Sequence, residues 1–304
     1  MSNGTLAEVR PGVTDEENPS PDPTPPAETG GPPDTVIRPP KGWHPVNVRD
    51  LWRYRELLFF LVWRDVKVRY KQTALGVAWA VLQPLLMMAV FTVFFGRLAG
   101  LPSGDVPYPL FAFAGLLPWT FFSTALASAG NSVVTNERLI TKVYFPRLAV
   151  PFAAVGAAAV DFAIAGGLLL VLMLGYGVAP GWSILFAPVV FLFLAVGAVG
   201  FGTLLAALNV KYRDFRYVIP FLVQFWMFAT PTVYMQPPAD ADDALHTLLN
   251  LNPLTGLVAA FRAACLGSPI PWAQFGLSAV AVVVVFVAGC LYFRKAEDEF
   301  ADVI

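Results

Sequence analysis

No basic residue lies between Lys71 and Arg97, and the intervening residues are almost all apolar. A helix rises about 1.5 Å per residue, so a helix over this stretch is long enough to cross the roughly 30 Å hydrocarbon core of a membrane. The chain of 304 residues is 57% hydrophobic and only 13% charged, whereas a typical globular protein has about 25% charged residues. These features predict a polytopic membrane protein.

Five further apolar runs follow, each close to the roughly 20 residues that a spanning helix needs. Basic residues gather before the first run, between the second and third, between the fourth and fifth, and after the sixth. The positive-inside rule makes these segments cytoplasmic. The sequence predicts an all-α transmembrane domain over 73–293, with both termini cytoplasmic and a C-terminal segment at 294–304. The six predicted transmembrane helices are 75–99, 108–133, 148–175, 183–208, 216–236 and 272–293.

Two different segments precede the first span. Residues 1–48 are acidic and rich in Pro, with no apolar stretch typical of a signal peptide, so we expect a disordered cytoplasmic tail. Residues 49–72 are predicted to form an amphipathic interface helix, with Leu58, Val62 and Val66 on one side. The alternative is a plain topology signal. Asp65 and Arg69 are spaced for an i,i+4 ion pair. The bases expected near anionic lipid headgroups are Arg64, Lys67, Arg69 and Lys71.

Signatures of several catalytic classes are missing from the sequence. It has no G-x-x-x-x-G-K-[ST], no H-E-x-x-H and no G-x-S-x-G. The two histidines, His44 and His246, fall on opposite sides of the predicted membrane, so no metal site is expected. Asp161 is the one acid inside the predicted spans. Because a carboxylate is costly in hydrocarbon, Asp161 either bonds to a polar group on a neighbouring helix or takes part in function directly.

Three stretches resemble one family, and they occur in the order expected for it. They are LVWRDVKVRYKQTALGVAWAVLQPL at 61–85, NERLITKVYFPRLAVP at 136–151 and LNPLTGLVAAFRAACLG at 251–267. Together they are similar to the membrane subunits of type 2 ABC exporters, which move polysaccharides such as O-antigen, teichoic acid and lipid-linked wall galactan. The resemblance covers roughly residues 50–300. It implies a non-enzymatic permease of the plasma membrane that exports a polyprenyl-linked polysaccharide, either an O-antigen-like glycan or a wall galactan precursor.

The resemblance also implies partners. ATP and Mg would bind to two copies of a separate ABC ATPase, and a second copy of this chain would complete the conduit among the membrane lipids; no nucleic acid is expected. The loop 135–145 is expected to carry a short helix, capped by Thr135 or Asn136, that docks on the ATPase. The outer segment 237–271 is expected to form a re-entrant helix pair. The predicted coupling residues are Thr135, Asn136, Glu137, Arg138, Leu139, Lys142, Tyr144 and Phe145, and those of a second cytoplasmic contact are Lys211, Arg213 and Asp214.

Aromatic residues are concentrated in the first, second and fifth predicted spans. Such rings are typical of interfacial belts and of packed cores. Rings that line a conduit could instead stack on sugar faces through adaptable, weakly directional contacts. The candidate conduit residues are Trp79, Phe91, Phe94, Phe95, Phe113, Trp119, Phe225, Trp226 and Phe228. The third span also has small residues that permit close helix approach, namely Gly156, Ala157, Ala158, Gly166 and Gly167.

Two other classes of protein compete with the exporter. A membrane-embedded glycan-assembly enzyme would need grouped acids or bases in a loop, and the acidic cluster Asp240, Asp242 and Asp243 reads more easily as a solvated turn. An ion-coupled flippase would usually need more than one intramembrane acid, and the spans contain only Asp161. The sequence therefore favours the exporter permease and keeps both alternatives open.

Overall fold

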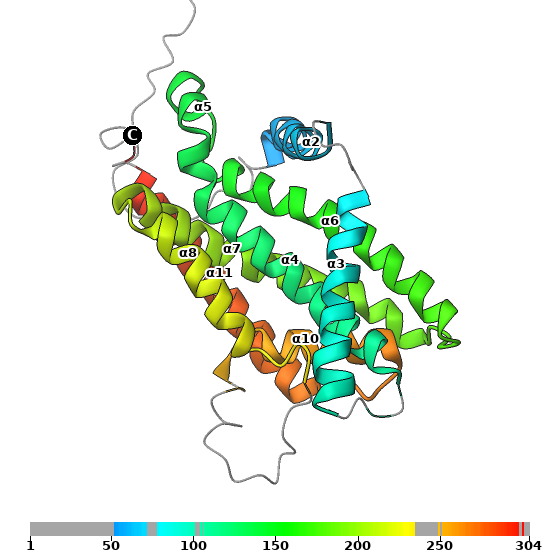
Figure 1. The fold of residues 1–304 in the computed structure, drawn as a ribbon. Helices are drawn as coiled ribbons and strands as arrows, with labels where there is room; N and C mark the ends of the chain where they lie inside the picture. The colour runs from blue at the N-terminus through cyan, green and yellow to red at the C-terminus, as the bar shows by residue number, and fades with distance from the viewer. Residues whose placement is uncertain are drawn as a thin grey trace, which may run out of the picture. The chain divides into compact units, whose positions relative to one another are not determined.

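The computed structural model describes residues 52–71, 78–100, 104, 106–234, 249, 251–297 and 300, and these form helices and their connections without any strand. The predicted all-α class is thus confirmed for this part of the chain, while the predicted tail 1–48 lies outside it. Figure 1 shows the arrangement. The elements are α2 (Arg55–Lys71), α3 (Ala78–Phe91), the π-helix η1 (Thr92–Leu98), α4 (Tyr108–Thr135), α5 (Glu137–Lys142), α6 (Ala149–Gly175), the 3-10 helix η2 (Trp182–Phe186), α7 (Ala187–Lys211), α8 (Phe215–Phe228), α10 (Thr255–Leu266) and α11 (Trp272–Glu297).

Local sequence accounts for several helix ends. α4 and α7 each have a Pro in the first turn, Pro109 and Pro188, where the missing N–H costs nothing because the first four N–H groups of a helix have no partner within it. α10 ends at Gly267, which takes a left-handed conformation with φ 75°, as a residue without Cβ does readily. These signals fix where the chain turns between neighbouring helices.

Five helical stretches are long and apolar enough to cross a membrane: Val81–Leu98, Tyr108–Thr135, Ala149–Gly175, Trp182–Lys211 and Trp272–Glu297. The chain is therefore a multi-pass membrane protein. The predicted span 216–236 differs from expectation, because its helix, α8, has only 14 residues. The chain leaves the helix at Ala229, two residues before Pro231. A Pro disfavours the helical conformation of the residue that precedes it, here Thr230, which explains the early end.

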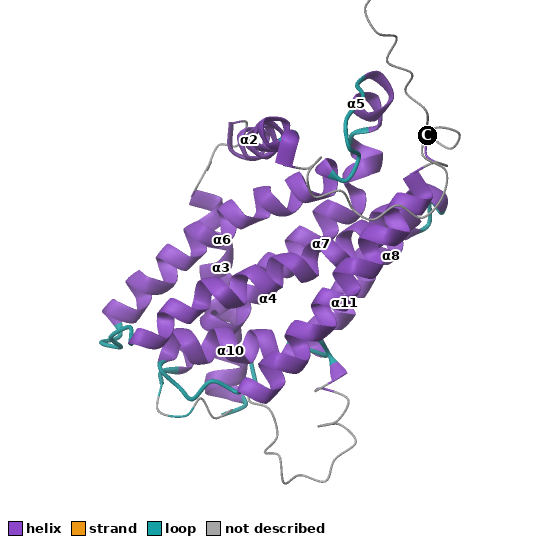
Figure 2. Cartoon of the chain, turned by 180° about the vertical axis from the view of Figure 1, so that it is seen from behind, coloured by secondary structure: helices purple, strands orange, loops and turns teal. Residues whose placement is uncertain are grey.

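α4 is the buried centre of this helical unit. It packs most extensively against α6 and α7, and α11 covers the other side of α7; Figure 2 shows α4 running beside α7 from behind. Large side chains of α4 such as Phe113 and Phe122 are fully buried. Small residues let the neighbours come close: a Cβ on Gly202 of α7 would lie 2.5 Å from the Cβ of Ala129 on α4. α4 is thus almost enclosed by protein, unlike the other long helices.

The α7–α11 contact depends on two glycines. A Cβ on Gly200 would lie 2.6 Å from the Cα of Phe286, and a Cβ on Gly289 would collide with the carbonyl oxygen of Gly200. Small residues at such positions are a known means of close helix approach in membranes. In α6, the prediction holds for Gly156, where a Cβ would lie 2.8 Å from Val62 of α2, but a Cβ on Gly166 or Gly167 meets nothing within 4 Å.

Gly289→Ala should destabilise the protein, because the added methyl group would push apart two backbones rather than a flexible side chain. Overpacking of this kind costs about 1–3 kcal/mol, measurable as a lower unfolding midpoint in detergent. The matched control is Gly276→Ala in the same helix, where a Cβ meets nothing within 4 Å; it should leave the midpoint unchanged. Equal effects of the two changes would contradict the close α7–α11 packing.

Candidate functional site

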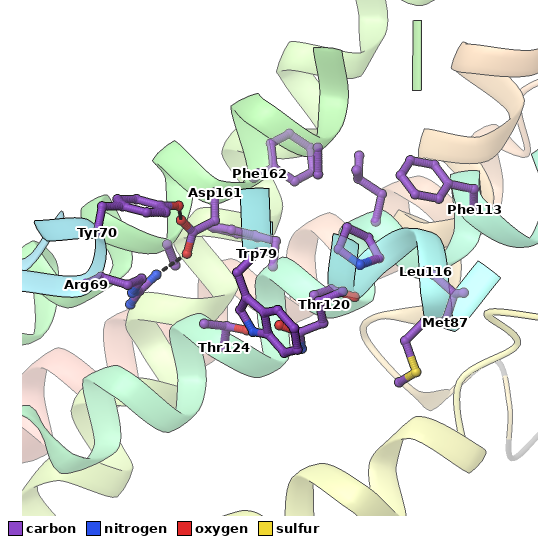
Figure 3. A pocket seen from close by; sticks show the side chains of 16 residues that line it. Arg69, Tyr70, Trp79, Met87, Phe113, Leu116, Thr120, Thr124, Asp161 and Phe162 are labelled. Atoms are coloured by element: carbon purple, nitrogen blue, oxygen red, sulfur yellow. Dashed lines mark hydrogen bonds and ion pairs between the residues drawn. The ribbon is translucent and has the colours of Figure 1, made fainter. Parts of the chain in front are cut away.

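Asp161, near the middle of α6, is bonded to the end of α2. Arg69 donates a hydrogen bond through Nη1 to one carboxylate oxygen and forms an ion pair with it, and the Tyr70 hydroxyl donates to the other oxygen. The dashed lines in Figure 3 mark these contacts. The prediction that Asp161 bonds to a polar group on a neighbouring helix is confirmed. The predicted Asp65–Arg69 pair is wrong, because Asp65 accepts instead from Arg64 at 2.8 Å.

The contact between α2 and α6 places this pair. Val62 of α2 lies against Gly156 of α6, five residues before Asp161, and Leu61 is buried. Burial, followed by the hydrogen bond to Asp161, raises the pKa of Tyr70 to about 12. Tyr70 therefore stays protonated at physiological pH and can keep donating to the carboxylate.

A cavity of about 420 Å³ lies next to the pair, between α2, α3, α4 and α6. In Figure 3 Arg69, Tyr70 and Asp161 lie at one side of it, Trp79 and Thr124 lie near the centre, and Phe113, Leu116 and Met87 lie at the other side. The charged residues of the cavity thus lie at the opposite side from Phe113, Leu116 and Met87. The lining residues are Arg69, Tyr70, Trp79, Gln83, Pro84, Met87, Phe113, Leu116, Leu117, Thr120, Phe121, Thr124, Ala158, Asp161, Phe162 and Ala165.

A second contact joins α2 to the α4–α5 junction. Arg64 donates from Nη2 to the side-chain oxygen of Asn136 at 2.7 Å, and the Asn136 amide nitrogen donates to the carbonyl of Ser132 at 2.8 Å. Asn136 occupies the N-cap position of α5, but its side chain makes no capping bond, and Thr135 donates back to the carbonyl of Asn131. The predicted capping by Thr135 or Asn136 is therefore wrong, because Asn136 bridges α4 and α2 instead.

The predicted coupling loop has an outer and an inner set of residues. Tyr144 is 81% exposed, and Thr135, Glu137, Arg138 and Lys142 are also exposed. Leu139 and Phe145 face inward, where they pack in a cluster with Ile140, Leu148, Val210 and Phe293. α5 is thus a short helix with one exposed side, and its opposite side packs on the apolar cluster. Lys211, Arg213 and Asp214 are exposed at the junction of α7 and α8. This junction lies beside the same apolar cluster, because Val210, the residue before Lys211, belongs to that cluster.

The predicted conduit aromatics fall into three groups. Trp79, Phe94, Phe225 and Phe228 are exposed on α3, η1 and α8. Phe91 and Phe95 stack on each other with ring centroids 5.5 Å apart. Phe113 and Trp119 are buried within this one chain, Trp119 next to Phe122, and Trp226 packs between Phe122 and Phe201. Phe113 and Trp119 thus belong to the core of the single chain, and Trp226 is partly buried against it. A conduit role stays a prediction for the whole set.

A polar cluster between α4, α8 and α10 was not predicted from the sequence. Asn252 accepts from the Trp226 indole at 2.9 Å and donates to the Ala229 carbonyl and the Thr230 hydroxyl. Arg262 donates to the carbonyls of Pro231 and Thr232 and lies 4.0 Å above the Phe111 ring. The cluster binds the irregular segment after α8. Its only sequence signals are the Asn-Pro pair at 252–253 and a lone base in an apolar segment.

The family pattern of ABC-2 type transporters matches residues 56–266. The chain belongs to the ABC-2 type transporter family. It is 34% identical over 260 residues to the O-antigen export system permease protein RfbA of Myxococcus xanthus, covering 84% of this chain and 98% of that protein. It is 22% identical over 251 residues to the protein of the same name from Klebsiella pneumoniae, covering 82% and 95%. The polysialic acid transport protein KpsM of Escherichia coli is 26% identical over 76 residues, 25% of this chain and 30% of that protein.

These relatives of the ABC-2 family are named as transport permeases, which agrees with a transporter membrane subunit rather than an enzyme. The matched region begins in α2 and ends at the last residue of α10. It therefore includes most of α2, all of α5, Asp161 and the polar cluster of Asn252 and Arg262. In the part of the chain that the structure describes, no group of three His, Cys, Asp or Glu residues is placed to hold a metal ion.

The Arg69–Asp161 pair should appear as coupling in a double-mutant cycle. Asp161→Leu alone leaves Arg69 without its carboxylate, whereas Arg69→Met with Asp161→Leu removes both charges, so the double variant should lose less stability than the two single changes added together. Because both side chains are about one third exposed, we expect a coupling energy of about 1 kcal/mol. The measurement is the free energy of unfolding from titration with sodium dodecyl sulfate.

The control cycle combines Arg69→Met with Asp65→Leu. Their spacing suggests an ion pair, but the structure pairs Asp65 with Arg64, so these two changes should add within about 0.5 kcal/mol. Coupling in this cycle, together with additivity in the Asp161 cycle, would show that Arg69 pairs with Asp65 and not with Asp161.

Proposed function

We propose that this chain is the permease subunit of an ABC exporter that moves a lipid-linked polysaccharide out of the cytoplasm across the plasma membrane. Energy would come from ATP and Mg bound to two copies of a partner ATPase. The observation that carries the proposal is the likeness to an O-antigen permease over 98% of that protein's length. An O-antigen-like glycan is the substrate best supported by the relatives, and a wall galactan precursor is the second candidate.

Six crossings with both termini in the cytoplasm are the topology that we propose. Ile219 of α8 lies against Gly130 of α4, where a Cβ would come within 2.8 Å, and Tyr108 donates to the carbonyl of Val233 at 2.8 Å. The segment 219–233 therefore follows α4 from Gly130 back to Tyr108, about 33 Å along the helix. This length supports a fifth crossing made of α8 and the irregular residues after it. Their carbonyls are bonded by Asn252 and Arg262, as non-helical backbone in a membrane requires.

The contacts of Asn252 support a re-entrant outer segment, because they place Asn252 level with the middle of α4. Asn252 bonds to Trp226, and Trp226 packs on Phe122 at the middle of α4 with ring centroids 5.3 Å apart. α10 then leads back outward, since Ser183 of η2 donates to the carbonyl of Ala264 at 2.9 Å. We propose that α10 is the second helix of the predicted pair in 237–271. The first falls mostly on residues outside the described ranges.

The exposed side of α5 is proposed to dock on the ATPase, with Lys211, Arg213 and Asp214 as a second contact. A short helix that packs on a buried apolar cluster can transmit its displacement to the helices of that cluster, because packed cores deform little. A second copy of the chain would complete the conduit. Among the predicted conduit aromatics, those exposed on α3, η1 and α8 could face the conduit or the lipid. Arg64, Lys67, Arg69 and Lys71 would hold α2 at the cytoplasmic interface.

The ion-coupled flippase is less well supported by the site. Both oxygens of the Asp161 carboxylate are already engaged, one by Arg69 and the other by Tyr70, so a coupled ion would have to displace these partners. The glycan-assembly enzyme would rely on Asp240, Asp242 and Asp243, which lie outside the described residues.

Glu137, Arg138 and Tyr144 should be needed for coupling and not for folding. We expect a triple alanine variant to reach the membrane in normal amounts and to retain ATP hydrolysis in the complex, with export reduced at least about tenfold, which corresponds to roughly 1.4 kcal/mol. The measurements are glycan export and ATP hydrolysis by the purified complex. The control is Tyr176→Ala at the other end of α6, also an exposed tyrosine, which should not change either. Normal export by the triple variant would remove α5 from the mechanism.

Cysteine labelling should reveal the proposed orientation. The natural cysteines, Cys265 and Cys290, are both buried and should give little background. Tyr144→Cys and Trp182→Cys replace side chains that are 81% and 90% exposed. In intact cells a membrane-impermeant maleimide should label only Trp182→Cys, whereas Tyr144→Cys and Lys67→Cys should react after permeabilisation. Labelling of Tyr144→Cys in intact cells would overturn the topology.

A further inference from the structure

The cavity beside Asp161 has the size and opening of a small-molecule site. Its volume of about 420 Å³ falls within the 300–1,000 Å³ that such sites usually have. The wall made by α4 is closed, because Phe113 and Leu116 are buried. The wall made by α3 is open, because Trp79 is 50% exposed and Met87 is also exposed. A ligand could therefore enter past α3 and lie against α4.

One row of α4 side chains in this cavity changes from apolar to polar along the helix, and Leu117 and Phe121 line the cavity beside it. Phe113, Leu116, Thr120 and Thr124 follow one another at spacings of three and four residues and line the same cavity. The distance from Phe113 to Thr124 along the helix is about 16 Å. A ligand that fills the cavity must therefore combine an apolar part with a part able to form hydrogen bonds.

The charges of the cavity favour a polar part that carries no net charge. Arg69 and Asp161 are the charged residues among those that line it, and they neutralise each other. A phosphate or carboxylate would have to compete with Asp161 for Arg69, and a cation would have to compete with Arg69 for Asp161. Lys67 and Lys71, the nearby bases of α2, are not among the lining residues. The site thus lacks the uncompensated charge that an ionic headgroup requires.

The polar side chains of the cavity are suited to hydroxyl groups. Thr120, Thr124 and Gln83 can each donate and accept a hydrogen bond, which is what neighbouring sugar hydroxyls require. Trp79, whose side chain is half exposed, lines the cavity together with Thr124 and Asp161. A tryptophan combines a large apolar face with a polar N–H, and can cover the C–H face of a sugar while the hydroxyls bond elsewhere.

We propose that this cavity binds an amphiphile with an uncharged, hydroxyl-bearing head. The head lies between Trp79, Thr124 and Asp161, and the first part of the tail lies along Phe113, Leu116 and Met87. The natural ligand would be a glycolipid of the membrane, and this part of the inference rests on the proposed function. All the residues that line the site belong to one chain.

The test is photolabelling of the permease–ATPase complex in nanodiscs of phosphatidylcholine and phosphatidylglycerol. The probe is dodecyl maltoside with a diazirine in its alkyl chain, and the labelled peptides are identified by mass spectrometry. Labels should map to α3 and α4 near Met87 and Leu116. Unlabelled dodecyl maltoside should compete at least about tenfold better than dodecylphosphocholine or dodecyl phosphate, which share its tail.

Thr124→Val keeps the shape of the side chain and removes its hydroxyl, so it should weaken the competition by maltoside about fivefold, the effect expected for one lost hydrogen bond. The matched control is Ser123→Ala, a neighbouring hydroxyl of α4 that does not line the cavity, and it should have no effect. The competition series uses the unmodified complex, so it is decisive even where a variant folds poorly.

Equal competition by the three amphiphiles would show a groove for any lipid tail and would overturn the proposal. Absence of labels from α3 and α4 would overturn it as well. If labelling is absent while ATP-driven export is normal, this inference fails and the proposed function stands. If labelling follows the expected pattern while the complex exports no glycan, the binding site stands and the proposed function fails.

Discussion

α4 is enclosed by α6 and α7 and flanked by α3, α8 and α10, and the positions of the other elements follow from this burial. Its large side chains, among them Phe113 and Phe122, fill the core, while Ala129 and Gly130 allow α7 and α8 to approach closely. Because dense packing resists deformation, the two ends of α4 are fixed relative to each other. One end presents Tyr108 to the segment after α8, and the other end continues into α5.

α2 is joined to this core at two places that are far apart in the sequence. Arg64 bonds to Asn136 where α4 meets α5, and Arg69 bonds to Asp161 in the middle of α6. A displacement of α5 would therefore act on α4 through the backbone and on α2 through Arg64. It would reach the cavity as well, since Arg69 and Asp161 both line it. This connection gives a physical route between the proposed ATPase contact and the proposed ligand site.

The sequence predicts the parts of this structure that depend on composition and length. Long apolar runs and their flanking bases were enough to place five helices, because a helix is the structure in which a continuous apolar segment satisfies its own backbone in a membrane. The cost of a buried carboxylate likewise predicted a partner for Asp161. Its identity did not follow, because the i,i+4 spacing of Asp65 and Arg69 suggested a local pair, and only the packing of Val62 on Gly156 brings Arg69 to α6.

Other features depend on contacts between distant segments. The fifth predicted span combines a short helix with irregular backbone, and this is possible only because Asn252 and Arg262 bond to its carbonyls from a segment more than twenty residues later. The burial of Phe113 and Trp119 could not be distinguished from a place in a conduit by sequence, since an apolar ring suits a core, a lipid face and a sugar equally. The position of Asn136 suggested an N-cap, but Arg64 engages its side chain instead.

The central claim is that this chain forms a polysaccharide export path powered by ATP on a partner subunit. The most direct measurement uses sealed inverted vesicles that contain the permease, its ATPase and a lipid-linked polysaccharide, with glycan uptake followed while the energy source is changed. Uptake should require ATP, stop when hydrolysis is blocked, and continue after an ionophore has collapsed the proton gradient. Uptake that ends with the proton gradient while ATP remains would contradict the account and would make Asp161 the first residue to re-examine.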